Sequence, residues 1–395
     1  KQPAVFVCEL PREECEEFRF RRYELHALKH SHNCGLIFNG LRIPGSSLLE
    51  SKQGNGLTIA YHGLNRGRVA VCATAAGQLR NLLAGMLAWG GKRVTYGQPI
   101  AKRELVTRRI GRMAALIVGC DALSDWCAGL LDQGYRGELE CIVAKVFGSE
   151  ALKEGAIDLA LKTHGGRAFV RGHACGDNMH DYLAPTIYEG EGDLLGLALF
   201  KGLVKQHATT YFEPLMKAMR QAGLKAPPRW NPLQWWKLRG AAWPYGKWIL
   251  SRRRPQGSRL PKSLAVSEAL AQFSPLVEFA TREFTATGLQ IDRALRRHQL
   301  RLADRQCRMS ELAKRVQRLT AMLCVALYGA AQTNELSRAA ALVLGNDLQR
   351  ELTGRPISDA ELRVTVELGQ SVLRDPATLL ADCPPASIVM PYDAG

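Results

Sequence analysis

The fold is decided by residues 161–200, LKTHGGRAFVRGHACGDNMHDYLAPTIYEGEGDLLGLALF. Gly165-Gly166 closes one helical pattern, and TIYEGEGD at 186–193 opens another. Glycines let the backbone around Glu189 approach a ligand closely, and a helix start offers amide donors to an anion or a carbonyl. A carboxylate at this place can serve as a general base. Taken alone, a Glu in a glycine-rich turn is more often a helix cap or a solvated charge than a general base.

On both sides of this stretch, apolar residues recur at helical spacing. Such stripes with short connections predict an antiparallel four-helix bundle over 53–206. The apolar stripes that define its helices run through 69–86, 106–120, 139–163 and 194–204. Upstream, residues 1–52 hold short apolar runs closed by turn residues, which predicts the end of an antiparallel β-domain. The expected strands cover 4–10, 18–28 and 35–43.

The second half of the chain changes character twice. Residues 207–267 read as a basic, Trp-rich linker, because 214–266 hold twelve Lys or Arg, no acidic residue and five of the seven tryptophans. Its prolines are expected to interrupt any long helix. Residues 268–380 return to helical stripes and predict a second helical domain, followed by a tail at 381–395. The predicted fold class is therefore mainly α, with a short β-domain remnant.

Composition narrows the function classes. The chain of 395 residues carries a formal charge of +16, which favours an anionic partner such as a phosphate-bearing cofactor, a lipid surface or nucleic acid. The eleven cysteines show no Cys-x-x-Cys spacing, so we expect reduced thiols and no metal site. The longest apolar run, 319–331, is shorter than the ~20 residues of a spanning helix, and none is predicted. The chain begins at Lys1 without a signal-peptide pattern, so we expect a processed, truncated or split protein.

Several elements in order resemble the acyl-CoA dehydrogenase family. Its members carry an Arg-x-x-Phe-Gly-x-x-Ile element between two bundle helices, a Gly-Gly turn, an Arg-Asp pair, and Ile-Tyr-Glu-Gly-Thr before the last bundle helix. The corresponding elements here are Ile43-Pro44, the Leu-x-x-x-Arg pattern at 64–68, RVTYGQPI at 93–100, Gly165-Gly166, His180-Asp181 and IYEG at 187–190. The helical pattern after residue 279 is similar to the C-terminal extension of the very-long-chain type.

The resemblance implies an FAD-dependent enzyme in which Glu189 removes the proton α to an acyl-CoA thioester and the β-hydrogen leaves as hydride to FAD. Some family members place the base beside the arginine of the first bundle helix, where this chain has Gly67. Residues implied in cofactor binding are Arg93, Tyr96, Gly165, Gly166, Glu191 and Asp193. Those implied in substrate binding are Arg68, Tyr188 and Gly190. The chain departs from the family pattern at Glu191, Lys162, Glu104, Thr107 and His180.

The expected function is dehydrogenation of a long- or very-long-chain acyl-CoA, with electrons passing to an electron-transfer flavoprotein. The chain is expected to form a homodimer, or a complex with an N-terminal chain that completes the β-domain. The segment 214–267 is expected to attach the protein peripherally to a membrane, because Trp and basic residues favour the anionic interface. Cytoplasmic location at a bacterial inner membrane is the first expectation, and the matrix side of the mitochondrial inner membrane the second. Alternatives are a non-catalytic or partner-completing subunit and, less favoured, a nucleic-acid-binding family member.

Overall fold

The computed structural model describes residues 2–50, 54–224, 231–253, 271–381 and 383–384, and these are predominantly helical. The predicted mainly α fold class is confirmed. The chain divides into two compact units, one comprising 1–191 with 359–395 and the other 192–358. The boundaries of these units lie at 191/192 and 358/359, so the chain returns to the first unit at residue 359. The expected domain limits at 206 and 268 stay predictions.

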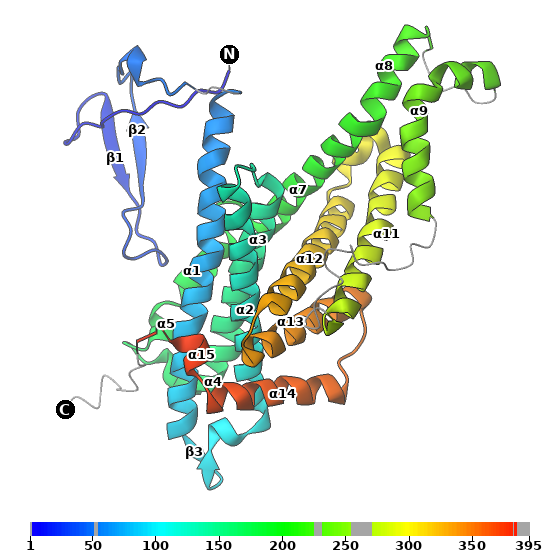
Figure 1. Ribbon diagram of the computed structural model, residues 1–395. Helices are drawn as coiled ribbons and strands as arrows, with labels where there is room; N and C mark the ends of the chain where they lie inside the picture. Colours follow the sequence, from blue (N-terminus) through cyan, green and yellow to red (C-terminus); the bar gives the residue numbers. More distant parts are fainter. Residues whose placement is uncertain (1, 51–53, 225–230, 254–270, 382, 385–395) are drawn as a thin grey trace. The chain divides into compact units, whose positions relative to one another are not determined.

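Three long helical segments run side by side in the first unit (Figure 1). They match the apolar stripes of the sequence: α1 (Gly56–Lys92), α2 (Glu104–Asp132) and α3 (Glu138–Lys153), which η3 (Glu154–Leu161) and α4 (Lys162–His164) continue. Leu79, Leu83, Met86, Ile110 and Ile117 are fully or almost fully buried between them. Two further pieces, α14 (Asp359–Arg374) and α15 (Ala377–Leu380), join this unit.

Glycines set how closely these helices approach. A Cβ at Gly111 of α2 would lie 2.1 Å from the carbonyl oxygen of Thr365 in α14, and one at Gly369 would lie 2.0 Å from that of Thr107. The α2–α14 crossing is therefore a backbone contact that a larger residue would push apart. By length and composition α2 could also cross a membrane, with a mean hydropathy of 1.5, but 61% of that apolar window is buried inside the protein. A core helix meets the same criterion.

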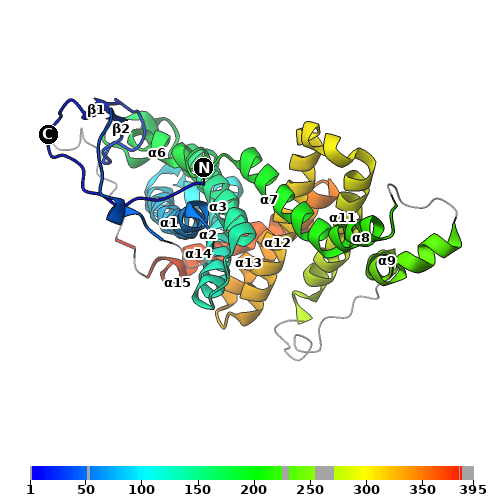
Figure 2. The same cartoon turned by 90° about the horizontal axis from the view of Figure 1, so that it is seen from above.

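The N-terminal segment contains fewer strands than expected. β1 (Phe18–Arg22) and β2 (Cys34–Phe38) form an antiparallel pair in which Phe18 faces Phe38. The predicted strand at 4–10 is wrong: only an isolated bridge joins Phe6 to Leu48. Phe6 and Val7 are exposed, so the apolar run there gains no burial from strand pairing within the described chain. Figure 2 shows the pair and α6 (Met179–Leu183) on the same side of α1, and the connection between the strands contacts α6 through the stacked rings of His26 and His180.

The second unit is helical throughout its described part. Its long helices pack as α7 with α12, α11 with α12, and α12 with α13. The bounds are α7 (Gly192–His207), η6 (Ala208–Phe212), α8 (Glu213–Gln221), α9 (Pro232–Arg253), α11 (Ser274–His298), η7 (Gln299–Asp304), α12 (Gln306–Ala331) and α13 (Glu335–Thr353). The predicted stripe of α12 is buried at Leu312, Val316 and Leu319.

The expectation that prolines interrupt the basic segment is wrong for α9, which continues through Pro244. Proline there cannot donate to the carbonyl one turn earlier. The loss is offset by packing, because Tyr245 and Trp248, directly after Pro244, join an aromatic cluster with His207 and Tyr211. Residues 254–267 of the expected linker lie outside the described residues.

Candidate active site around Glu189

Glu189 lies in the loop between η5 (Ala184–Thr186) and α7. It has a φ of 57°, which is rare for a non-glycine residue, and Gly190 follows with a φ of 106°. A left-handed backbone at a residue with a Cβ costs about 1–2 kcal/mol and persists only where the surroundings hold it. Such strain concentrates at functional sites, and here it turns the Glu189 side chain toward α1.

The Glu189 carboxylate lies directly against Gly67 of α1. A Cβ built at Gly67 would meet Oε1 at 2.5 Å and Oε2 at 3.1 Å, so the missing side chain at this position makes the room that the carboxylate occupies. Oε2 is buried, and no hydrogen-bond partner for it exists among the described residues. A buried carboxylate oxygen without a partner is costly and is available to a ligand proton.

Two buried cations accompany this carboxylate. Arg68 of α1 is 7% exposed and Lys145 of α3 is fully buried. The helices that carry them touch at Gly148, where a Cβ would lie 2.7 Å from the Cα of Cys72. Since Cys72 follows Arg68 by one turn and Gly148 follows Lys145 by one turn, this contact brings the two cations to the same level of the bundle.

Neighbouring side chains hold Arg68 in place. Its Nη1 donates to the Asn65 side-chain oxygen at 3.1 Å, while the Asn65 amide donates to the Arg136 carbonyl at 3.0 Å. The Nε of Arg68 is buried and has no partner within the described chain. The Glu189 oxygen and this nitrogen are complementary unsatisfied groups, which favours a polar ligand at this place.

Residues 177–181, which precede the Glu189 loop, are tied to the N-terminal segment. The Leu28 amide donates to Asp181, Lys29 donates to the Asp177 carbonyl at 2.6 Å, and His26 stacks on His180 at 5.2 Å. His180 is one of the departures from the family pattern, and its ring takes part in this contact. Burial, with the nearby Glu189 and Asp181 charges, raises the pKa of Tyr188 above its usual range.

A second group of predicted residues gathers at the other end of α1. Tyr96 is 97% exposed in the turn between β3 (Val94–Thr95) and β4 (Gln98–Pro99), next to the exposed Arg93. The Gly165-Gly166 turn lies near the same end, because Arg167 stacks at 3.9 Å on Trp89, one turn before Arg93. From Gly67 to Trp89 the helix rises by roughly 33 Å at 1.5 Å per residue. The base candidate and these cofactor candidates are therefore far apart within one chain.

The remaining predicted residues are Glu191 and Asp193. The Glu191 charge acts on Lys145, together with that of Glu189. Asp193 accepts from the Ser310 hydroxyl at 2.6 Å and pairs with Lys314 at 3.0 Å, and these contacts lower the pKa of Asp193. Asp193 thereby anchors the start of α7 to α12 inside the second unit.

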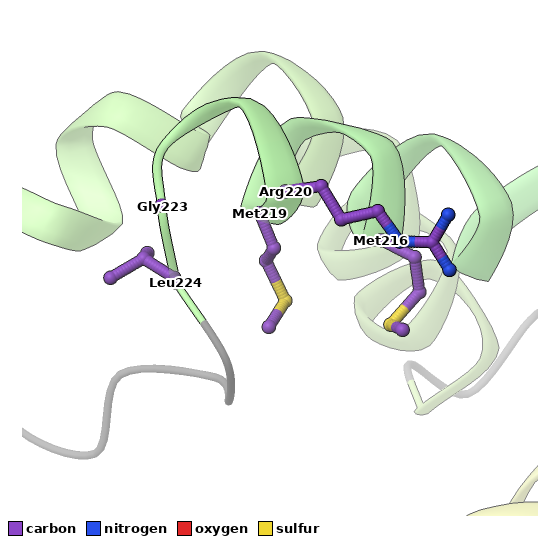
Figure 3. A pocket seen from close by; sticks show the side chains of 5 residues that line it. All are labelled: Met216, Met219, Arg220, Gly223 and Leu224. Atoms are coloured by element: carbon purple, nitrogen blue, oxygen red, sulfur yellow. The ribbon is translucent and has the colours of Figure 1, made fainter.

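A surface pocket of about 420 Å³ lies at the end of α8 (Figure 3). Figure 3 shows Met219 and Leu224 beside it, with Arg220 on the same helix end. None of the predicted site residues is among the residues that line this pocket. Its position carries no argument about the chemistry at Glu189.

The sequence analysis missed two features of the first unit. Lys145 stands in an otherwise apolar helical row (CIVAKVF, 141–147), and a lysine on a buried face is the signal that would have revealed it. His164, directly before Gly165, is 9% exposed with a buried Nδ1 that has no partner in the described chain. Burial, His173 and Arg167 lower the pKa of His164 to about 4.

Residues 54–203 match the family model "Acyl-CoA dehydrogenase, C-terminal domain", so the bundle and its Glu189 loop are similar to that domain. The matched range begins just before α1 and ends inside α7, and it contains Gly67, Lys145 and Glu189.

Relatives extend the comparison beyond that domain. The very long-chain specific acyl-CoA dehydrogenase of Macaca fascicularis mitochondria is 28% identical over 43% of this chain and 26% of its own length. A probable acyl-CoA dehydrogenase, FadE10 of Mycobacterium bovis, is 27% identical over 67% of this chain and 40% of its own length. The matched part of the chain thus spans well under half of these relatives.

Among solved structures, an acyl-CoA dehydrogenase from Bacillus anthracis, crystallised with FAD, matches 94% of this chain and 65% of its own with a TM-score of 0.64. At 17% identity the likeness concerns the fold alone. It nevertheless covers the second unit as well as the bundle, so the helical extension after residue 206 belongs to a known architecture.

Proposed function

We propose that this chain forms the C-terminal part of an FAD-dependent dehydrogenase acting on a long- or very-long-chain acyl-CoA thioester. The observation that carries the proposal is the Glu189 carboxylate, which lies against Gly67 with a buried, unpartnered Oε2. The match of residues 54–203 to the family model supports the reaction class. The chain-length preference rests on the relatives of the very-long-chain type.

In this reaction Glu189 takes the proton from the carbon α to the thioester. The backbone amide of Glu189 would donate to the thioester oxygen and stabilise the negative charge that develops there. Arg68, Tyr188 and Gly190 would bind the acyl-CoA. When bound, FAD would accept the hydride from the β-carbon, and an electron-transfer flavoprotein would receive the electrons.

The residues at the far end of α1 fit a phosphate-bearing cofactor. Gly165 has a φ of 68°, and no described atom lies within 4 Å of a Cβ built there or at Gly166, so the turn is open to a ligand. Arg93 is exposed and offers a guanidinium fork to a phosphate. Because these residues lie roughly 33 Å along α1 from Gly67, they would contact the FAD of a second subunit, which supports a homodimer.

The proposal is tested by Glu189→Gln, with Glu138→Gln, at an exposed position of α3, as the matched control. Full-length protein loaded with FAD is assayed with saturated acyl-CoA thioesters of increasing chain length and an artificial electron acceptor. Loss of a general base lowers turnover by about 10²–10⁴-fold, with bound flavin and thermal stability retained. Wild-type turnover in Glu189→Gln would overturn the assignment, and an inactive, flavin-free wild type would favour the non-catalytic alternative.

A second proposal concerns the surface of α9. Trp236, Trp243 and Leu250 recur every seven residues, so they share one helix face, and their side chains are 65%, 70% and 52% exposed. Arg239 stacks on Trp236 at 4.0 Å, and the helix carries no acidic residue. Such a face suits an anionic lipid surface, at a bacterial inner membrane or the matrix side of a mitochondrial one.

Vesicle binding tests the α9 face. Wild type should sediment with vesicles containing phosphatidylserine or cardiolipin, and Trp236→Ser with Trp243→Ser should weaken this binding at least tenfold. Double-stranded and single-stranded DNA serve as the competing ligands. Tighter, strongly salt-dependent binding to DNA than to vesicles would favour the nucleic-acid alternative instead.

A further inference from the structure

Lys145 is a fully buried lysine beside the candidate base. Lysine is almost never fully buried unless its ammonium is paired, because removing the charge from water is expensive. Its Nζ donates to the carbonyl oxygen of Gly190 at 2.5 Å. The hydrogen bond thus ends on the residue that directly follows Glu189.

Opposing effects act on the ammonium of Lys145, and their net result is a pKa below its ordinary value. Burial lowers its pKa, the Glu189 carboxylate raises it, and the Arg68 charge lowers it. Glu189 therefore supplies the largest favourable charge for the buried ammonium. Further favourable charges come from Glu150 and Glu191.

A hydrogen bond to the Gly190 carbonyl can fix the conformation of the loop that carries Glu189. Glu189 and Gly190 both have positive φ, at 57° and 106°, and the first of these is unfavourable for a residue with a Cβ. A hydrogen bond from a buried ammonium to the next carbonyl fixes the peptide orientation after Glu189. Without that bond, the loop can relax to a less strained backbone that turns the carboxylate away from Gly67.

We propose that Lys145 is a positioning residue of the active site: its ammonium holds the Gly190 carbonyl and balances the Glu189 charge, which keeps the base against α1. This inference rests on the proposed function for its kinetic consequence. Its structural consequence, the ordering of the 187–191 loop, does not depend on the reaction.

The test compares Lys145→Met with Lys153→Met, a partly exposed lysine at the end of the same helix. Methionine keeps the length of the side chain and removes the ammonium. Full-length protein with FAD is assayed per bound flavin, and amide hydrogen exchange is followed with and without substrate. Lys145→Met should lower kcat by about 100-fold with KM changed less than threefold, since a displaced catalytic group costs about this much.

Two readouts separate positioning from a purely structural role. In Lys145→Met the amides of 187–191 should exchange at least tenfold faster, while those of α1 and α3 remain unchanged. In Lys145→Ala, added propylammonium should restore at least tenfold of the lost kcat, whereas propanol should not. Unchanged exchange in the loop, or equal rescue by propanol, would overturn the proposal.

A failure of the proposed function would be distinguishable from a failure of the Lys145 proposal by the turnover of the wild type. If wild type shows no turnover, the reaction is wrong, and the exchange experiment still decides whether Lys145 orders the loop. If Lys145→Met does not fold, Lys145→Arg keeps a cation in the core but displaces the Gly190 carbonyl by its larger head. Its kcat should then fall at least tenfold, and a wild-type kcat would overturn the proposal.

Discussion

Each unit contains a buried cluster of charges, and the two clusters differ in how well their atoms are satisfied. In the second unit, Asp292 is fully buried and accepts from Tyr245 at 2.7 Å, His207 at 3.1 Å and Arg296 at 2.9 Å. In the first unit, Glu189 and Arg68 each leave a buried polar atom without a partner among the described residues. A satisfied cluster stabilises a fold, whereas unsatisfied atoms await a ligand.

The Asp292 cluster joins three helical segments. His207 ends α7, Tyr245 lies in α9, and Asp292 and Arg296 belong to α11. Rings of His207, Tyr211, Tyr245 and Trp248 surround the hydrogen bonds. Burial, together with the hydrogen bond to Asp292, raises the pKa of Tyr245 well above its usual value.

The largest expected effect is the loss of stability when the Asp292 cluster is disrupted. Asp292→Ala leaves a histidine and a tyrosine without their shared acceptor and should lower the free energy of unfolding by about 3–5 kcal/mol. Denaturant unfolding followed by tryptophan fluorescence measures it, because α9 carries four tryptophans. Asp304→Ala, at an exposed carboxylate of the same unit, is the control and should stay within about 0.5 kcal/mol of wild type. Equal stability of the two variants would show that the buried pairing contributes nothing.

The next largest effect is expected for a substitution beside Glu189 in the first unit, which should change activity and leave stability nearly unchanged. Gly67→Ala places a methyl group 2.5 Å from Glu189 Oε1, and the flexible carboxylate is the group that moves. Turnover should fall about 100-fold, while the melting temperature stays within a few degrees. Gly63→Ala, one turn earlier on α1 with no described atom within 4 Å of its Cβ, should leave turnover unchanged. Equal turnover in both variants would show that the position of the Glu189 carboxylate does not matter for the reaction.

The sequence predicts much of the first unit and its Glu189 site, but little of the Asp292 cluster in the second unit. The bundle helices follow from apolar spacing, and Glu189 and Gly67 follow from the resemblance, since both occupy positions where the family places a base. The Asp292 cluster could not be predicted, because its histidine and tyrosine are 85 and 47 residues away along the chain. Only the fold brings such partners together.

The failures of prediction have local causes. The run at 4–10 is a short apolar segment of the kind typical of strands, but it finds no described partner beyond one bridge, so strand propensity alone did not decide it. Pro244 normally ends a helix, yet tertiary packing of Tyr245 and Trp248 holds α9 together. The burial of Lys145 was not predicted, because a lysine is expected at the surface unless the face of the helix that carries it is known.

The smallest effect extends the comparison to a third buried polar group, His164, whose Nδ1 has no partner in the described chain. Its folded pKa of about 4 is below the usual 6.5, so the unfolded chain binds the proton more tightly. The stability that His164 contributes is therefore complete above pH 6.5 and is lost as the pH falls toward 4, by about 2 kcal/mol at pH 5.

His173, at 4.7 Å, and Arg167 face the same ring and remain in place in His164→Phe. Urea unfolding of His164→Phe at pH 7 and pH 5 should show an acid loss about 2 kcal/mol smaller than that of wild type. The exposed His32→Phe should keep the full wild-type loss. An identical acid loss in all three proteins would mean that the unsatisfied ring is not what makes the bundle acid-sensitive, and the contrast between satisfied and unsatisfied buried groups would then hold only at Glu189.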